Sequence, residues 1–124
     1  MQALIDSFRM GGFGMIPTAF FGLVLVVVSV VYLRRPDRAL VAPLVSLGVL
    51  TLAAGGFGFV TGLIASATAL GPGTDPRLLE VGIGESLHNL SWALAFIMMA
   101  SLFVSASGLR VAFRVGGHVP TEAR

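Results

Sequence analysis

Three long stretches without a formal charge constrain this chain more than any other feature. Residues 10–33, 39–74 and 86–109 contain no Asp, Glu, Lys or Arg, and they are 24, 36 and 24 residues long. A helix needs about 20 mostly apolar residues to cross a hydrocarbon core of about 30 Å. Inside lipid the backbone must satisfy its own hydrogen bonds, which favours helix even in valine-rich runs. The sequence therefore predicts an all-α integral membrane protein with three transmembrane helices.

Composition supports the same fold class and excludes several functions. The 124 residues are 56% hydrophobic and 11% charged, whereas a soluble domain carries about 25% charged residues. The chain has no cysteine, which excludes disulfides, thiol catalysis and cysteine-ligated metals. Its two histidines, His88 and His118, are too far apart in sequence to indicate a metal cluster. We expect no enzymatic activity and no cofactor.

The 36-residue run needs a decision between one crossing and two. As one helix it would be about 54 Å long, but two crossings would need about 40 residues plus a turn. Pro43 suits a first helical turn, and the Gly-Pro-Gly sequence at 71–73 terminates helices. We therefore predict a single span at about 42–70, between spans at about 15–33 and 86–109.

The segments outside these spans are short. Residues 1–12 have apolar side chains on one helical face, with Asp6 and Arg9 off it, which predicts a short interfacial helix. Residues 13–115 form the expected three-helix transmembrane domain. Residues 116–124 are expected to be a flexible tail.

Arginine placement indicates the topology. The first loop holds Arg34, Arg35 and Arg38, and three more arginines follow residue 109, against only Arg9 and Arg77 on the other side. Positive residues favour the cytoplasmic side. We expect a multi-pass protein of a bacterial inner membrane, with the N-terminus outside and the C-terminus cytoplasmic. The basic balance then reflects topology, and no nucleic-acid partner is expected.

A glycine face marks the second span. Gly55, Gly58 and Gly62 are spaced three and four residues apart, so they share one side of a helix. Small residues let helix backbones approach closely, which drives association in lipid. The simplest interpretation is helix packing, within one chain or between chains. The alternative is a glycine face that lines a pore or admits a ligand.

Polar residues gather at the start of the third span. Glu85, His88 and Asn89 are spaced i, i+3 and i+4 and can meet on one face. Glu85 and His88 fit a polar cap at the outer end of the helix, and a carboxylate beside an imidazole could alternatively relay protons. Asn89 and Ser91 lie deeper, where polar groups usually bond across helices.

No charged side chain lies deep within any expected span. Ion and proton pathways through membranes usually contain such a group. A transport role would therefore require a carboxylate from another chain.

Three segments together resemble the MotA/TolQ/ExbB proton-channel family. The segment at 11–35 has the Gly-rich start, the Met near a Pro and the apolar run ending in arginine of that family's first span. The segment at 55–64 resembles the pattern Gly-Leu-Leu-Gly-Thr-Val-x-Gly-Met, matched in register by Gly55, Gly58, Val60 and Gly62. The segment at 81–94 resembles the stretch Gly-Ile-x-Glu-Ala-Leu, matched by Gly82, Ile83, Glu85 and Leu87.

The resemblance implies an oligomeric channel. In that family five copies surround one or two single-span partners, which bring a membrane aspartate, and ion flow drives work on the envelope. By this resemblance the expected pore lining is Phe59, Thr61, Asn89 and Ser91, with Phe59 standing where the pattern has threonine. The large cytoplasmic insertion of the family is reduced to five residues at 34–38. A non-conducting structural or accessory membrane subunit is the alternative.

Overall fold

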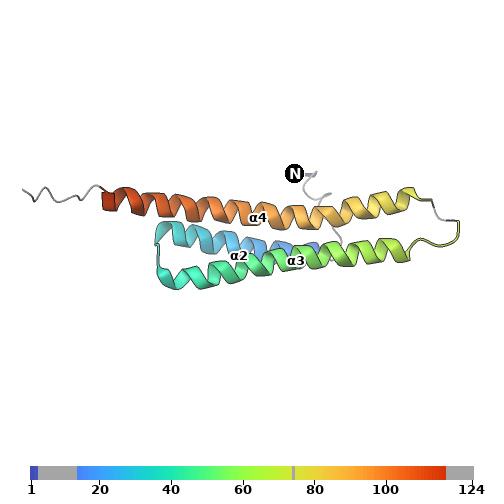
Figure 1. The fold of residues 1–124 in the computed structure, drawn as a ribbon, viewed down its shortest axis with the longest axis horizontal. Helices are drawn as coiled ribbons and strands as arrows, with labels where there is room; N and C mark the ends of the chain where they lie inside the picture. Colours follow the sequence, from blue (N-terminus) through green and yellow to red (C-terminus); the bar gives the residue numbers. More distant parts are fainter. Residues whose placement is uncertain (3–13, 74, 117–124) are drawn as a thin grey trace, which may run out of the picture.

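The computed structural model describes residues 1–2, 14–73 and 75–116, and these contain three long helices and no strand. The helices run side by side as an antiparallel bundle, joined by short connections (Figure 1). In chain order the elements are α2 (Met15–Arg34), the 3₁₀ helix η1 (Arg38–Leu40), α3 (Val41–Thr68) and α4 (Arg77–Gly116). All three long helices are long and apolar enough to cross a membrane.

The expected helices are therefore present. The span expected at 15–33 is α2. The 36-residue uncharged run at 39–74 forms one long helix, α3, rather than two. The span expected at 86–109 is the uncharged middle of α4, which has 40 residues. At 1.5 Å per residue α4 is about 60 Å long, about twice the hydrocarbon thickness, so it extends beyond the membrane core. The interfacial helix expected at 1–12 and the tail expected at 116–124 fall almost entirely outside the described residues.

Local chemistry sets the helix ends. Arg35 is extended (φ −136°), as expected for a residue that precedes a proline, and α2 stops there. The Asp37 carboxylate accepts a hydrogen bond from the Ala39 amide at 3.0 Å, at the start of η1. The Asp75 carboxylate does the same for the amide of Arg77, also at 3.0 Å. Between α3 and α4, Gly73 adopts φ +95°, which favours glycine in that turn.

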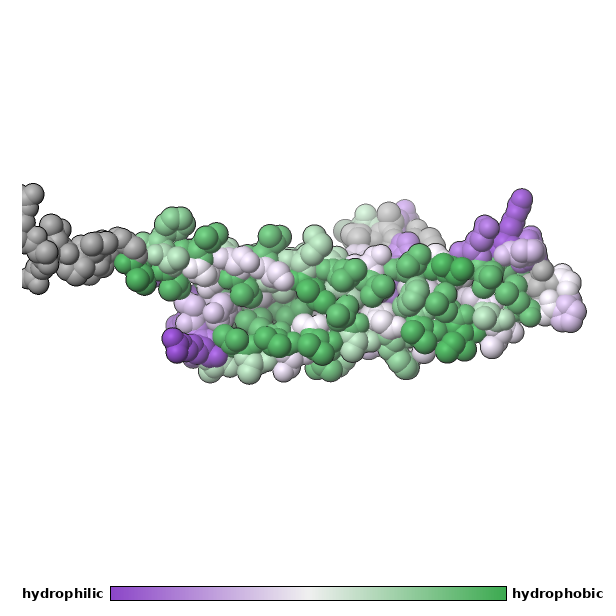
Figure 2. All heavy atoms as spheres, in the orientation of Figure 1, coloured by the Kyte–Doolittle hydropathy of each residue, from purple (hydrophilic) through white to green (hydrophobic). Residues whose placement is uncertain are grey.

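Most side chains buried inside the bundle are small or polar, whereas the side chains on its outer surface are mostly large and apolar. Its buried polar side chains are Thr18, Ser29, Thr51, Ser86, Asn89 and Ser107, and its buried apolar ones are Met15, Leu25, Leu44, Ala93 and Ala100. Bulky side chains such as Phe57 (66% exposed) and Met98 (67%) face outward. Figure 2 shows this hydrophobic surface along most of the visible face. Water would penalise such a surface but lipid does not, so the outer face suits contact with a bilayer.

Four of the buried hydroxyls, those of Thr18, Ser29, Thr51 and Ser86, donate to carbonyls of the preceding turn. Thr18 donates to the Gly14 carbonyl at 3.0 Å, Ser29 to Leu25 at 2.9 Å and Thr51 to Leu47 at 2.7 Å. These bonds remove the cost of burying the hydroxyl groups. Small side chains can therefore fill the interior, and the helices can pack closely.

Gly22 of α2 lies directly against the ring of Phe96 of α4, and a Cβ at Gly22 would overlap that ring. We expect Gly22→Ala to destabilise the bundle by about 1–3 kcal/mol, the usual cost of overpacking. Phe96→Leu should recover part of this loss in the double variant. The measurement is reversible unfolding in mixed micelles.

Gly108→Ala is the matched control, because a Cβ there meets nothing within 4 Å. It should be neutral or slightly stabilising, since alanine is the better helix former. Equal destabilisation by the two substitutions would contradict the Gly22–Phe96 contact.

Candidate functional site at the crossing of the three helices

The glycine face of α3 lies against α4 of the same chain. A Cβ at Gly55 would overlap the Cβ of Ala93, and one at Gly62 would overlap the hydroxyl of Ser86. A Cβ at Gly58 would stand 2.6 Å from the side-chain nitrogen of Asn89. Any larger residue at these positions would push the helices apart. The three glycines thus set the distance between α3 and α4.

Asn89 lies where all three helices meet. Its side chain is 1% exposed. Gly14, at the start of α2, approaches it from the other side, and a Cβ on Gly14 would lie 2.6 Å from the Gly58 Cα and 2.7 Å from Asn89 Nδ2. The Asn89 amide therefore occupies space that is open because residues 14 and 58 are both glycines. A polar group in this position fixes how the helices align, because shifting it would place an amide against apolar neighbours.

Beyond this crossing, α3 and α4 continue as a pair past the start of α2 (Figure 1). Here the contact is reciprocal, since Gly62 faces Ser86 and Gly82 faces Ser66. Each serine hydroxyl donates to the glycine carbonyl four residues earlier in its own helix, Ser66 at 2.8 Å and Ser86 at 2.7 Å. Both helices carry the same Gly-x-x-x-Ser pattern, so each serine fits the notch left by the glycine opposite.

The four residues expected to line a pore do not come together within one chain. Asn89 is buried in the bundle, whereas Thr61 and Ser91 are exposed and Phe59 is partly buried. Thr61 donates to the Phe57 carbonyl at 2.9 Å, and Ser91 donates to the Leu87 carbonyl at 2.9 Å. These two hydroxyls therefore belong to the outer surface of α3 and α4 and are already satisfied there.

Glu85 and His88, which were expected to form a polar cap, do not bond to each other in the described structure. His88 places Nδ1 3.2 Å from the carbonyl of Gly84 on its own helix, and Glu85 is exposed. Among the described residues no hydrogen bond joins Glu85 to His88, so the carboxylate–imidazole relay is not formed. His88 and Ser91 border a shallow, open hollow of about 290 Å³ on α4.

Among the described residues, the crossing brings together no group suited to acid–base or metal chemistry. Within the described residues no three His, Cys, Asp or Glu side chains come close enough to hold a metal ion. The uncharged run of α4 and the whole of α2 up to Leu33 add no ionisable carboxylate or amine. What the arrangement can do is hold three helices at close distance around one buried amide.

Sequence reasoning found the α3 side of this contact and missed its partners. Gly14 and Gly22 were not expected at helix contacts, nor was the pairing of Ser66 with Gly82. The usable signal was the Gly-x-x-x-Ser pattern, which occurs at 62–66 and again at 82–86. A repeated small-residue pattern on two consecutive spans indicates that they pack together.

Gly58→Leu is expected to be the most damaging change to this crossing, because no side chain fits between Gly14 and Asn89. We expect a loss of about 1–3 kcal/mol or more in the free energy of unfolding, from overpacking. Gly108→Leu, on α4, is the control, because a Cβ there meets nothing within 4 Å. Equal unfolding free energies for the two variants in mixed micelles would contradict the assigned contact.

No protein-family model, curated protein or solved structure matches the chain. The resemblance to the MotA/TolQ/ExbB family therefore rests on the three sequence segments. Two of those segments, around Gly58 and around Asn89, contact each other in the bundle.

Proposed function

We propose that this protein is a subunit of an oligomeric inner-membrane complex built like the proton-channel stators, in which a single-span partner supplies the ion-carrying aspartate. One observation carries the proposal. The segments at 55–64 and 81–94, matched to the family separately in sequence, pack against each other through Gly55, Gly58 and Gly62. That contact supports treating the two segments as one unit. In this proposal α3 and α4 correspond to the last two spans of the family, and α2 packs against them.

The outer surface supports an assembly rather than a lone bundle. Gly56 and Gly84 have nothing within 4 Å of an added Cβ, although a helical glycine costs about 1 kcal/mol relative to alanine. In membranes, small residues on a helix surface are typical of contacts with other helices. We propose that copies of this chain pack there, as a pentamer by the resemblance.

The chain needs a partner to move a proton. The described spans offer hydroxyls, one buried amide and, near the outer end of α4, the His88 imidazole, but no carboxylate, whereas proton pathways in membranes usually contain a charged residue deep in a span. The aspartate of a single-span chain would meet this need, facing Thr61 or Ser91 across the surface of α3 or α4.

A non-conducting structural or accessory subunit is the second candidate, and two observations favour it. Phe59 stands where the family pattern has threonine, and a phenylalanine would narrow and dry a pathway. Asn89, which also belongs to the expected pore lining, is enclosed within the bundle at 1% exposure. Under this alternative the protein assembles but carries no ions.

The assembly can be tested by purifying the complex in mild detergent and measuring its intact mass. The stator proposal predicts several copies of this chain together with a single-span chain that has an aspartate in its span. A stable homo-oligomer without any such partner would favour the structural alternative.

Orientation can be tested with single cysteines, because the chain has none of its own. We expect a membrane-impermeant maleimide added outside to label Pro72→Cys, in the α3–α4 connection. Asp37→Cys, in the α2–α3 connection beside three arginines, should react only after the membrane is permeabilised. The reverse pattern would overturn the proposed topology.

Conduction can be tested at Phe59. In vesicles that contain the complex with its partner, Phe59→Thr should raise proton flux if the phenylalanine obstructs the path. Phe57→Thr is the control, because Phe57 is 66% exposed on the same helix. Unchanged flux in Phe59→Thr, or an equal rise in both variants, would remove the assigned role of Phe59.

A further inference from the structure

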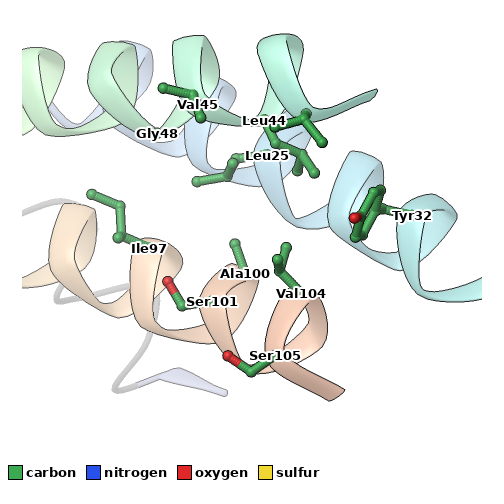
Figure 3. Close-up of a pocket in the computed structure, with 11 residues that line it drawn as sticks. Leu25, Tyr32, Leu44, Val45, Gly48, Ile97, Ala100, Ser101, Val104 and Ser105 are labelled. Atoms are coloured by element: carbon green, nitrogen blue, oxygen red, sulfur yellow. The ribbon is translucent and has the colours of Figure 1, made fainter. Parts of the chain in front are cut away.

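A groove of about 430 Å³ opens between α3 and α4 in the half of the bundle nearest the α2–α3 connection. Figure 3 shows its apolar floor, where Leu25 and Leu44 face Ala100 and Val104. Gly48 forms part of one wall and leaves open space there, since a Cβ at that position meets nothing within 4 Å. The volume falls in the range of about 300–1,000 Å³ that small-molecule sites occupy.

The groove spans the depth of one bilayer leaflet. On α3 it reaches from Val41 to Gly48, and Gly48 lies ten residues from Arg38, or about 15 Å along the helix. On α2 its deepest residue is Leu25, nine residues from Arg34, or about 14 Å. Half of the hydrocarbon core is about 15 Å thick. The depth of the groove below the arginines is therefore about the same whether it is measured along α3 or along α2.

That end of the bundle carries strong positive charge. Five arginines (34, 35, 38, 110 and 114) and one aspartate give it a formal charge of +4. One of the hydrophilic patches in Figure 2 lies where α2 leads into α3. In the part of the chain that the structure describes, none of these arginines forms an ion pair. A cluster of arginines at the end of a bundle attracts anions at the membrane surface.

From this combination we infer that the groove binds an anionic phospholipid, with an acyl chain against Leu25, Leu44 and Ala100 and the phosphate beside the arginines near Arg38. Basic residues at the cytoplasmic ends of spans bind anionic headgroups, and an apolar groove of leaflet depth accepts the chain. The inference does not depend on the stator proposal, because it concerns the single bundle alone.

The length of the groove suits an acyl chain. The lining runs over eight residues of α3, or about 12 Å. An extended hydrocarbon chain is a thin occupant for a groove this short, and it carries no polar backbone that would need partners.

Native mass spectrometry of the purified protein tests this site with phosphatidylglycerol and phosphatidylcholine of identical acyl chains. We expect tighter binding of phosphatidylglycerol, by about fivefold for each arginine that engages the headgroup. Gly48→Leu should fill the groove and abolish binding of phosphatidylglycerol. Ala53→Leu is the control on the same helix, because Ala53 is exposed and does not line the groove, and this variant should bind as the unmodified chain does.

A second variant tests the headgroup independently of the groove. Arg38→Gln should lower the preference for phosphatidylglycerol by about fivefold and leave the binding of phosphatidylcholine unchanged. Arg77→Gln removes an arginine at the opposite end and should have no effect.

Several results would overturn the inference. Equal binding by the Gly48→Leu and Ala53→Leu variants would exclude the groove. Equal affinity for the two lipids, unaffected by Arg38→Gln, would exclude the anion site. Displacement of the lipid by soluble glycerol phosphate would indicate an anion site without an acyl chain. A change of oligomeric mass in Gly48→Leu alone would make the groove a contact between copies.

Discussion

The close approach of α3 to α4 is the constraint on which the rest of this structure depends. Lipid solvates leucine as well as another helix does, so burial of apolar surface cannot hold membrane helices together. Dispersion contacts between backbones must supply the attraction, and they weaken steeply with distance. Gly55, Gly58 and Gly62 permit that distance, and Asn89 fixes the alignment by filling the space opposite Gly58 and Gly14.

This constraint also explains the reversed distribution of side chains. A seam of glycine, alanine and serine leaves little room for large residues between α3 and α4, so most bulky apolar side chains face outward, with Met15, Leu25 and Leu44 as buried exceptions. Toward the arginine-bearing end the seam residues become Leu44 and Leu25, and α3 and α4 no longer fit tightly together. The groove opens there. The tight crossing and the groove are therefore two consequences of one change in side-chain size along the same pair of helices.

The sequence predicted the helices well because two physical limits bound them. Hydrocarbon thickness sets the length of a span, and the charged residues mark its ends, so even the run at 39–74 resolved to one helix. Periodicity also identified the glycine face of α3. It could not identify what that face contacts, because spacing fixes a direction around one helix axis but not the neighbour in that direction. The roles of Gly14 and Gly22, and the groove itself, needed three-dimensional packing. The spacing of Glu85 and His88 permitted a contact, yet His88 instead lies near a carbonyl of its own helix.

The same packing separates the two proposed functions by what each requires of Asn89. A structural subunit needs the amide where it is, held between Gly14 and Gly58, because its alignment of the helices is then the whole of its role. A channel that used Asn89 as lining would have to expose it. That requires the start of α2 to move away or α3 and α4 to separate, which gives up the contacts that hold the bundle in lipid. Of the four residues of the expected pore lining, a channel that left the bundle intact would have only Thr61 and Ser91 as exposed polar groups for a partner's carboxylate, and both hydroxyls already donate to their own backbone. Conduction would then depend chiefly on ionisable groups of the partner chain, and this protein would surround the partner and separate those groups from lipid.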